Sequence, residues 1–144
     1  MTKPSFLAQA LLGSALVLGM SEAAAAAPSL DGLWLTDDRK GVVQISRCGI
    51  RLCGRIVRVL DTGPDVPSTD VNNPDPDKRK QPLVGTTVLW GFSEGKRVWS
   101  GGRAYDPKKG RSYKSSLSLN ADGSLKVTGC ILIVCRSVRW TRYS

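Results

Sequence analysis

The sequence predicts an all-β fold, an eight-stranded antiparallel up-and-down barrel preceded by a cleavable signal peptide. Three observations support this prediction. An apolar run near the N-terminus ends in a row of alanines, later segments alternate apolar and polar residues with a period of two, and short turn clusters separate these segments. No segment after Pro28 shows a convincing 3.6-residue apolar period, so helices are not expected.

The N-terminus has the three parts of a secretory signal. A positive start with Lys3 is followed by the apolar stretch Phe6–Met20 and by the small residues Ala23–Ala27. A membrane anchor is the alternative, but the uncharged run is shorter than the ~20 residues that span a bilayer, and glycines interrupt it. We therefore assign residues 1–27 to a signal peptide and expect a periplasmic or secreted protein with no transmembrane anchor.

Residues 28–144 have the size of a single domain with one modest core. The leader carries one lysine and one glutamate, so this domain keeps the whole net charge of +9. Such a charge favours anionic surfaces, although it also serves solubility alone. The chain has no histidine, which excludes His-based acid–base catalysis, Ser-His-Asp and Cys-His catalytic groups and His-containing zinc sites.

Alternation predicts each strand in turn. Between Tyr113 and Leu119, for example, the larger apolar groups fall at 113, 117 and 119 with polar residues between them, as in a half-buried strand. Short turns rich in Gly, Asp, Asn and Lys join the strands, which favours a meander closed into a barrel without exposed edges. The expected strands are Gly32–Thr36, Val42–Arg47, Leu52–Leu60, Thr86–Phe92, Arg97–Tyr105, Tyr113–Leu119, Leu125–Gly129 and Ser137–Arg142.

The four cysteines form two pairs with the same C-x4-C spacing, Cys48 with Cys53 and Cys130 with Cys135. In an oxidising compartment an even number of cysteines predicts disulfides, with three possible connectivities. We favour the two local pairs, because cysteines that flank a four-residue hairpin loop face each other at a distance that a disulfide spans. A Cys₄ zinc site is the weaker alternative, so no metal is expected.

One connection, residues 61–84, is long, with five prolines, many Asp and Asn residues and no expected regular structure. A connection of this kind is usually functional or disordered. Its acidic stretch Asp70–Asp77 suggests a calcium loop, but Pro74 stands at a ligand position and Gln81 where the bidentate glutamate belongs. We therefore expect Asx-turns that stiffen the loop instead of a calcium site.

The segment Ile131–Val134 is wholly apolar at the tip of a predicted hairpin, where polar residues are usual. Either it folds inward as part of the barrel lining, or it is an exposed patch that contacts a ligand, a membrane or a partner. Burial is the commoner outcome and is our expectation here.

Five stretches in order make the mature chain resemble the bacterial family catalogued as domain of unknown function 2147. The resemblance implies export and a lipocalin-like (calycin) barrel, and it implies no established activity. At Gln81 the family typically has an arginine, so no anion contact is carried over to that position. The stretches are Gly32-Leu33-Trp34, Cys48-Gly49 with Leu52–Ile56, Asn73–Pro76 with Arg79, Pro82-Leu83 and Gly85, Trp99–Gly102 with Tyr105–Pro107, Gly110 and Tyr113, and Trp140–Arg142.

The lipocalin likeness assigns a role to two residues. Lipocalin barrels stack an arginine of the last strand on the tryptophan of a Gly-x-Trp motif in the first strand, which closes one end of the barrel. Here the partners would be Trp34 and Arg142. The alternative is that Trp34 and Trp140 are simply core aromatics.

The leading functional hypothesis is a binding protein that holds a small apolar or amphiphilic molecule in the barrel mouth. An eight-stranded barrel can also be filled by its own side chains, so a cavity does not follow from the strand count. No cofactor and no nucleic acid partner is expected. The candidate lining residues are Trp90, Phe92, Trp99, Tyr105 and Tyr113.

The sequence offers residues for two other classes of function. A structural or interaction protein of the cell envelope would contact anionic polymers or lipid headgroups through basic residues, with Arg55, Arg58, Arg103 and Arg111 as candidates. An enzyme would have to rely on carboxylates in loops, namely Asp61, Asp70, Asp75 and Asp106. Because neither a base-activated serine nor a metal motif accompanies them, we expect no catalytic residues and no enzymatic activity.

Overall fold

The computed structural model describes residue 19 and residues 28–144. Apart from Gly19, the predicted signal peptide lies outside the described residues. The rest of the chain forms eight strands and one short 3-10 helix, η1 (Pro76–Lys78). The strands are β1 (Gly32–Leu35), β2 (Gly41–Cys48), β3 (Arg51–Val59), β4 (Thr87–Phe92), β5 (Val98–Asp106), β6 (Arg111–Leu119), β7 (Leu125–Ile131) and β8 (Val134–Arg142).

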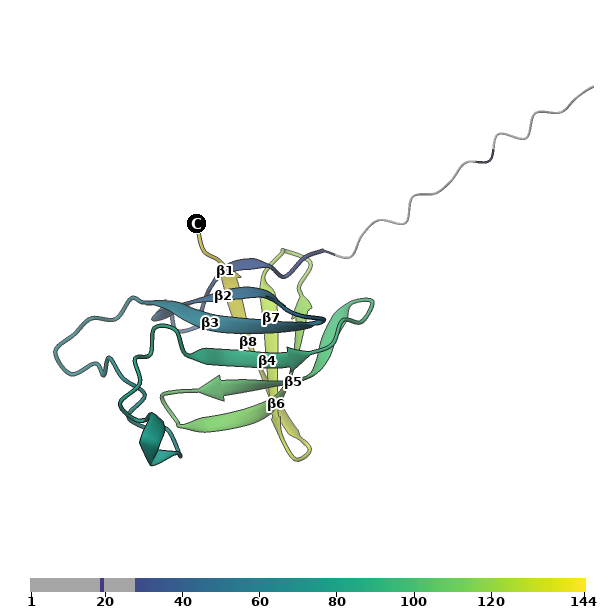
Figure 1. The fold of residues 1–144 in the computed structure, drawn as a ribbon. Helices are drawn as coiled ribbons and strands as arrows, with labels where there is room; N and C mark the ends of the chain where they lie inside the picture. Colours follow the sequence, from purple (N-terminus) through teal and green to yellow (C-terminus); the bar gives the residue numbers. More distant parts are fainter. Residues whose placement is uncertain (1–18, 20–27) are drawn as a thin grey trace, which may run out of the picture.

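The strands form a closed barrel in chain order, with every neighbouring pair antiparallel (Figure 1). Closure comes from β1 and β8, which pair Trp34 with Arg142 and Leu35 with Thr141. The predicted all-β, eight-stranded up-and-down barrel is therefore confirmed. The eight strands of the described residues lie within residues 32–142 and close the barrel among themselves.

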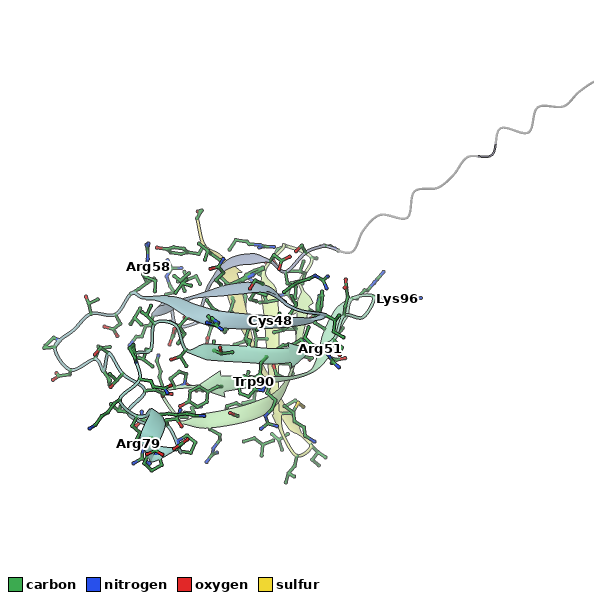
Figure 2. The ribbon with its side chains drawn as sticks, in the orientation of Figure 1. Cys48, Arg51, Arg58, Arg79, Trp90 and Lys96 are labelled. Atoms are coloured by element: carbon green, nitrogen blue, oxygen red, sulfur yellow. A yellow bond between two sulfur atoms is a disulfide. The ribbon has the colours of Figure 1, made fainter. Side chains whose placement is uncertain are left out.

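The connections gather at two ends of the barrel. Because consecutive strands alternate in direction, the β1–β2, β3–β4, β5–β6 and β7–β8 connections share one end, which we call the mouth. The other connections share the opposite end, which we call the closed end. Arg79 in the β3–β4 connection and Lys96 in the β4–β5 connection mark these two ends in Figure 2.

The core is concentrated toward the closed end. Leu30, Trp34 and Phe92 are almost fully buried there, and Trp99 packs in the same cluster. Phe92 lies against Gly102 of β5, where a Cβ atom would overlap the aromatic ring. A glycine at this position therefore allows the ring to cross the inside of the barrel, and the larger space among the described residues lies toward the mouth.

The long β3–β4 connection is ordered rather than structureless. An isolated bridge joins Thr69 to Pro82, and η1 lies between them. The amide of Asp75 donates to the Asn73 side chain at 2.9 Å, and the amide of Asp77 donates to the Asp75 side chain at 3.0 Å. The expected Asx-turns are thus present, and they give a segment with few apolar residues local hydrogen bonds of its own.

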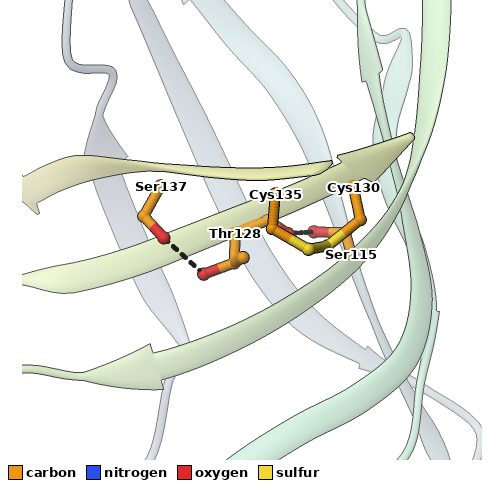
Figure 3. The surroundings of a disulfide bond; sticks show 5 residues. All are labelled: Ser115, Thr128, Cys130, Cys135 and Ser137. Carbon is orange, nitrogen blue, oxygen red and sulfur yellow. Dashed lines mark hydrogen bonds between the residues drawn. A yellow bond between two sulfur atoms is a disulfide. The ribbon is translucent and has the colours of Figure 1, made fainter. Parts of the chain in front are cut away.

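Both local disulfides are present. Cys48–Cys53 joins β2 to β3, and Cys130–Cys135 joins β7 to β8, with Cα atoms 5.9 and 4.1 Å apart. Beside the second, Thr128 and Ser137 share a hydrogen bond across the same two strands (Figure 3). Within residues 28–144 no cysteine is free, and no helix of the described chain is long and apolar enough to span a membrane.

The apolar hairpin tip corrects one expectation. Residues 131–134 do not fold inward: Leu132 is 92% exposed and Ile133 is 96% exposed. The reason is geometric, since β7 and β8 remain paired out to Ile131 and Val134 and carry the turn past the core. The hairpin projects beyond β6 at the bottom of Figure 1.

Candidate functional site

A cavity of about 730 Å³ opens at the mouth of the barrel. Its inner walls are apolar and come from strands all around the barrel, because alternate residues of each strand point inward. The β3–β4 connection and the β1–β2 and β5–β6 turns surround its rim. The principal apolar wall residues are Val43, Val88, Leu89, Ala104, Val127 and Trp140.

Two of the five candidate lining residues belong to this cavity. Tyr105 and Tyr113 line it, whereas Phe92 and Trp99 lie in the core and do not. Trp99 is covered by the guanidinium of Arg47, 5.1 Å from the ring centroid. Both rings are buried in the core, away from the cavity, because their height along the barrel axis decides whether an inward ring meets space or packing.

Trp90 lies outside the barrel. Trp90, labelled on β4 in Figure 2, is not among the residues that line the cavity, and its side chain is 36% exposed. Simple alternation fails on this strand, because Gly91, with a φ of +78°, interrupts the regular backbone between Trp90 and the buried Phe92. The expectation that Trp90 lines the cavity is therefore corrected.

Two ion pairs tie the rim together. Lys108 of the β5–β6 turn pairs with Asp38 of the β1–β2 turn, and Lys40 pairs with Asp61 at 2.9 Å. Burial would raise the pKa of Asp38, but hydrogen bonds from Lys108, Thr36 and the Lys40 amide together lower it. The hydrogen bond from Lys40 likewise lowers the pKa of Asp61. Connections far apart in sequence are thus held around one opening.

The buried carboxylate of Asp70 anchors the β3–β4 connection to the barrel. One oxygen accepts a hydrogen bond from the Tyr105 hydroxyl at 2.7 Å, and the other accepts from the Asn73 amide at 2.7 Å. Burial, together with the hydrogen bond to Asp70, raises the pKa of Tyr105 far above its ordinary value. Asn72 adds a second attachment, since its side chain donates to the Lys108 carbonyl at 3.0 Å.

Arg136 is the basic residue that β8 brings to the cavity. It belongs to the same inward row as Val138, Trp140 and Arg142, and both Arg136 and Val138 line the cavity. Across the strand pair it faces Gly129, which has no side chain to fill the space. Among residues 28–144, Arg136 takes part in none of the ion pairs. Because alternate residues of a strand share one face, the period-two pattern that includes Trp140 could have identified Arg136 from the sequence.

The closed end has the predicted stacking arrangement. The Arg142 guanidinium lies 4.0 Å from the Trp34 ring centroid, and it donates to the carbonyls of Asp31 and Ser29 at 2.6 and 2.9 Å. Gly32 has a φ of +127°, and a Cβ atom there would lie 2.7 Å from the Arg142 guanidinium. Sterics therefore explain why the Gly-x-Trp motif has a glycine at position 32, because a larger residue would occupy the space of the Arg142 guanidinium.

The four loop carboxylates have structural partners. Asp61 and Asp70 are paired as described above, Asp75 caps η1, and Asp106 accepts a hydrogen bond from the Lys108 amide at 3.0 Å. In the described part of the chain no three His, Cys, Asp or Glu side chains are grouped as a metal site would need. Asp61 and Asp106 line the cavity, and each of the four carboxylates has a hydrogen-bond or ion-pair partner.

The four arginines proposed for anionic partners are spread over β3, β5 and β6. Arg58 is engaged locally, because its guanidinium lies 5.9 Å from the Tyr143 ring centroid and donates to the hydroxyl at 3.2 Å. Arg55 lies on the same strand, while Arg103 and Arg111 lie on β5 and β6.

A family profile described as "Uncharacterized protein conserved in bacteria (DUF2147)" matches residues 32–142. Among solved structures, the chain is similar to protein HP1028 from the human pathogen Helicobacter pylori, which belongs to the lipocalin family. The TM-score is 0.71 at 22% identity, over 81% of this chain and 84% of that chain. At this identity the likeness concerns the fold. No curated protein sequence matches this chain.

Proposed function

We propose, from the premise that this chain belongs to the DUF2147 family and folds as a lipocalin-like barrel, that it binds a small amphiphilic molecule in the cavity at its mouth. The cavity carries this proposal, with its volume of about 730 Å³ and its apolar walls. Small-molecule sites typically have volumes of about 300–1,000 Å³ and mostly apolar linings. Lipocalins typically bind small hydrophobic molecules, which supports the same class of ligand.

The rim favours an amphiphile with an anionic head over a pure hydrocarbon. Arg136 stands beside Val138 on the wall of the cavity, where a polar head would meet it while the tail lies deeper. A guanidinium matches the planar, bidentate geometry of a carboxylate or phosphate. At the same rim, the carboxylates of Asp38 and Asp61 are already paired with lysines.

No reaction is proposed at this site, because the candidate carboxylates are engaged in turns, caps and ion pairs. The two disulfides fit an oxidising compartment, and we propose the periplasm or the medium as the location. N-terminal sequencing of the exported protein should find a start between Ala24 and Pro28. An intact Met1 on the cell-associated protein would contradict this proposal.

The binding proposal is tested with 1-anilinonaphthalene-8-sulfonate, a fluorescent anionic amphiphile, displaced by dodecanoate. We expect Ala104→Phe, which fills the cavity from its wall, to weaken both ligands by about tenfold or more. Val138→Trp is a second filling variant at a half-exposed position and does not disturb the core. Trp90→Ala is the matched control on the outer face and should change affinity less than about twofold.

Unchanged binding by both folded filling variants would place the probe elsewhere and reject the cavity as the site. Head-group recognition is tested separately with Arg136→Gln. This variant should weaken dodecanoate while leaving dodecanol unaffected, and Arg103→Gln on the outer face should change neither. Equal losses for dodecanoate and dodecanol would reject Arg136 as the contact for the anionic head.

A further inference from the structure

The exposed tip of the β7–β8 hairpin is unlike an ordinary turn. Its four residues, Ile131–Val134, are all aliphatic, and their side chains are between 46% and 96% exposed. The Cys130–Cys135 disulfide closes the hairpin directly behind them. The tip therefore presents a compact aliphatic surface on a braced support, at the mouth of the barrel.

The backbone at Leu132 shows that turn geometry does not account for this composition. Its φ is +53°, in the left-handed region. A two-residue hairpin turn with positive φ at its first position normally uses glycine there, since a Cβ atom is strained in this conformation. A leucine that is both strained and 92% exposed contributes neither to the turn nor to the core.

Positive charge accompanies the tip. Of the six basic residues on strands β6, β7 and β8, Lys114 and Arg136 lie next to the Cys130–Cys135 bridge, whereas Arg139 pairs with Asp122 and Arg142 stacks on Trp34 at the closed end. Lys114 lies directly across the strand pair from Cys130, and Arg136 follows Cys135. An aliphatic tip with basic neighbours is complementary to an anionic bilayer, whose acyl region accepts the tip while its headgroups attract the cations.

The size of the tip argues against a protein partner as its occupant. A stable protein interface uses about 20–30 residues on each side, whereas the tip has four residues on a narrow hairpin. Such a projection suits insertion into a soft apolar phase better than docking against a second copy.

We propose that the Ile131–Val134 tip inserts into the surface of an anionic lipid bilayer and docks the barrel there. The β7–β8 turn shares its end of the barrel with the cavity, so docking brings the mouth to the membrane. The four tip residues lie outside the cavity lining, so their insertion is tested separately from ligand binding, although Arg136 borders both the tip and the cavity.

The test is flotation of the exported, oxidised protein with vesicles of phosphatidylcholine, alone or with about a third phosphatidylglycerol. We expect binding to the anionic vesicles and weaker binding in high salt. Leu132→Ser with Ile133→Ser should reduce the partition coefficient about tenfold or more, since two exposed aliphatic side chains are lost. Lys114→Gln should weaken binding to the anionic vesicles alone.

Ile50→Ser is the matched control. Ile50 is 83% exposed at the tip of the other disulfide-closed hairpin, at the closed end, and its variant should bind like the parent. Equal binding by the parent and the Leu132/Ile133 double variant would overturn the proposal. So would tip-dependent dimerisation in sedimentation without vesicle binding. If the parent protein binds vesicles but does not bind 1-anilinonaphthalene-8-sulfonate, the cavity proposal alone is rejected.

Discussion

At the scale of single residues, the closed end depends on one arginine that makes three kinds of contact. Arg142 stacks on Trp34, donates to two carbonyls before β1, and occupies space that Gly32 leaves free. Trp34 is held from the other side, because its indole N–H donates to the Leu30 carbonyl at 2.8 Å. The first and last strands of the barrel are therefore joined by side chains as well as by strand pairing.

We expect Arg142→Ala to lower the free energy of unfolding by about 1–2 kcal/mol, since a partly exposed cation–π contact and two hydrogen bonds are lost. Arg142→Lys should recover only part of this, because an ammonium lacks the planar face that stacks. Urea denaturation of both variants checks the prediction. Equal stability of the lysine variant and the parent would show that charge alone, and not stacking, matters here.

Tyr105 and Asp70 form the contact that seats the β3–β4 connection. Tyr105→Phe removes the hydroxyl and leaves a buried carboxylate oxygen without its partner, which should cost about 1–3 kcal/mol. Because the pKa of Tyr105 is raised in the folded state, its contribution to stability is present below pH 10 and is lost as the pH rises beyond it. The free energy of unfolding of Tyr105→Phe should therefore fall less than that of the parent protein as the pH rises above 10. Denaturation of both proteins at several pH values measures this difference.

At the scale of the elements, a glycine sets how closely the β3–β4 connection approaches the β5–β6 turn. Gly110 has a φ of +59°, and a Cβ atom there would overlap the Asn72 carbonyl. Backbone of the connection therefore lies directly on backbone of the turn. No larger residue fits without moving one of them.

Gly110→Ala should displace the connection, lower stability by about 2–4 kcal/mol and expose residues 61–84 to limited proteolysis. Gly123→Ala is the matched control, because Gly123 also has a positive φ, of +82°, but a Cβ atom there would meet nothing within 4 Å. It should cost only the backbone strain, about 1–2 kcal/mol. Equal effects of the two variants would show that the connection is not held at Gly110.

At the scale of the whole molecule, ion pairs join three connections around the mouth. The pKa values of Asp38 and Asp61 lie below their ordinary value of 3.8, so the unfolded chain takes up protons at these groups before the folded barrel does. The stability that they contribute is present above that value and is lost as the pH falls through the lowered pKa values.

We therefore expect acid to loosen the mouth before it unfolds the barrel, with the change beginning as the pH falls toward about 4. Hydrogen exchange in residues 61–84 should rise there while the core strands stay protected. Asp38→Asn and Lys108→Met should each remove part of this pH dependence, because each breaks the same pair. An unchanged acid response in both variants would contradict the assignment.

The sequence alone was sufficient for the strands, the turns, the barrel closure and the two disulfide pairs. These features are local or follow from a period-two pattern, and for Trp34 with Arg142 a family resemblance added the pairing. Of the five lining residues that the sequence suggested, only Tyr105 and Tyr113 lie at the cavity. Arg136, which also lines it, was not among the five.

Only the tertiary structure decided where each inward side chain lies along the barrel axis. Phe92 and Trp99 face inward as Tyr113 does, but the strand stagger and the Phe92–Gly102 packing put them in the core and leave the space at the mouth. The tertiary structure also decided the pairs Asp38–Lys108 and Asp70–Tyr105, because their partners are far apart in sequence and meet only in the folded barrel. Alternation sets the face of a strand, whereas the height within a barrel depends on register with every neighbouring strand, which no local pattern contains.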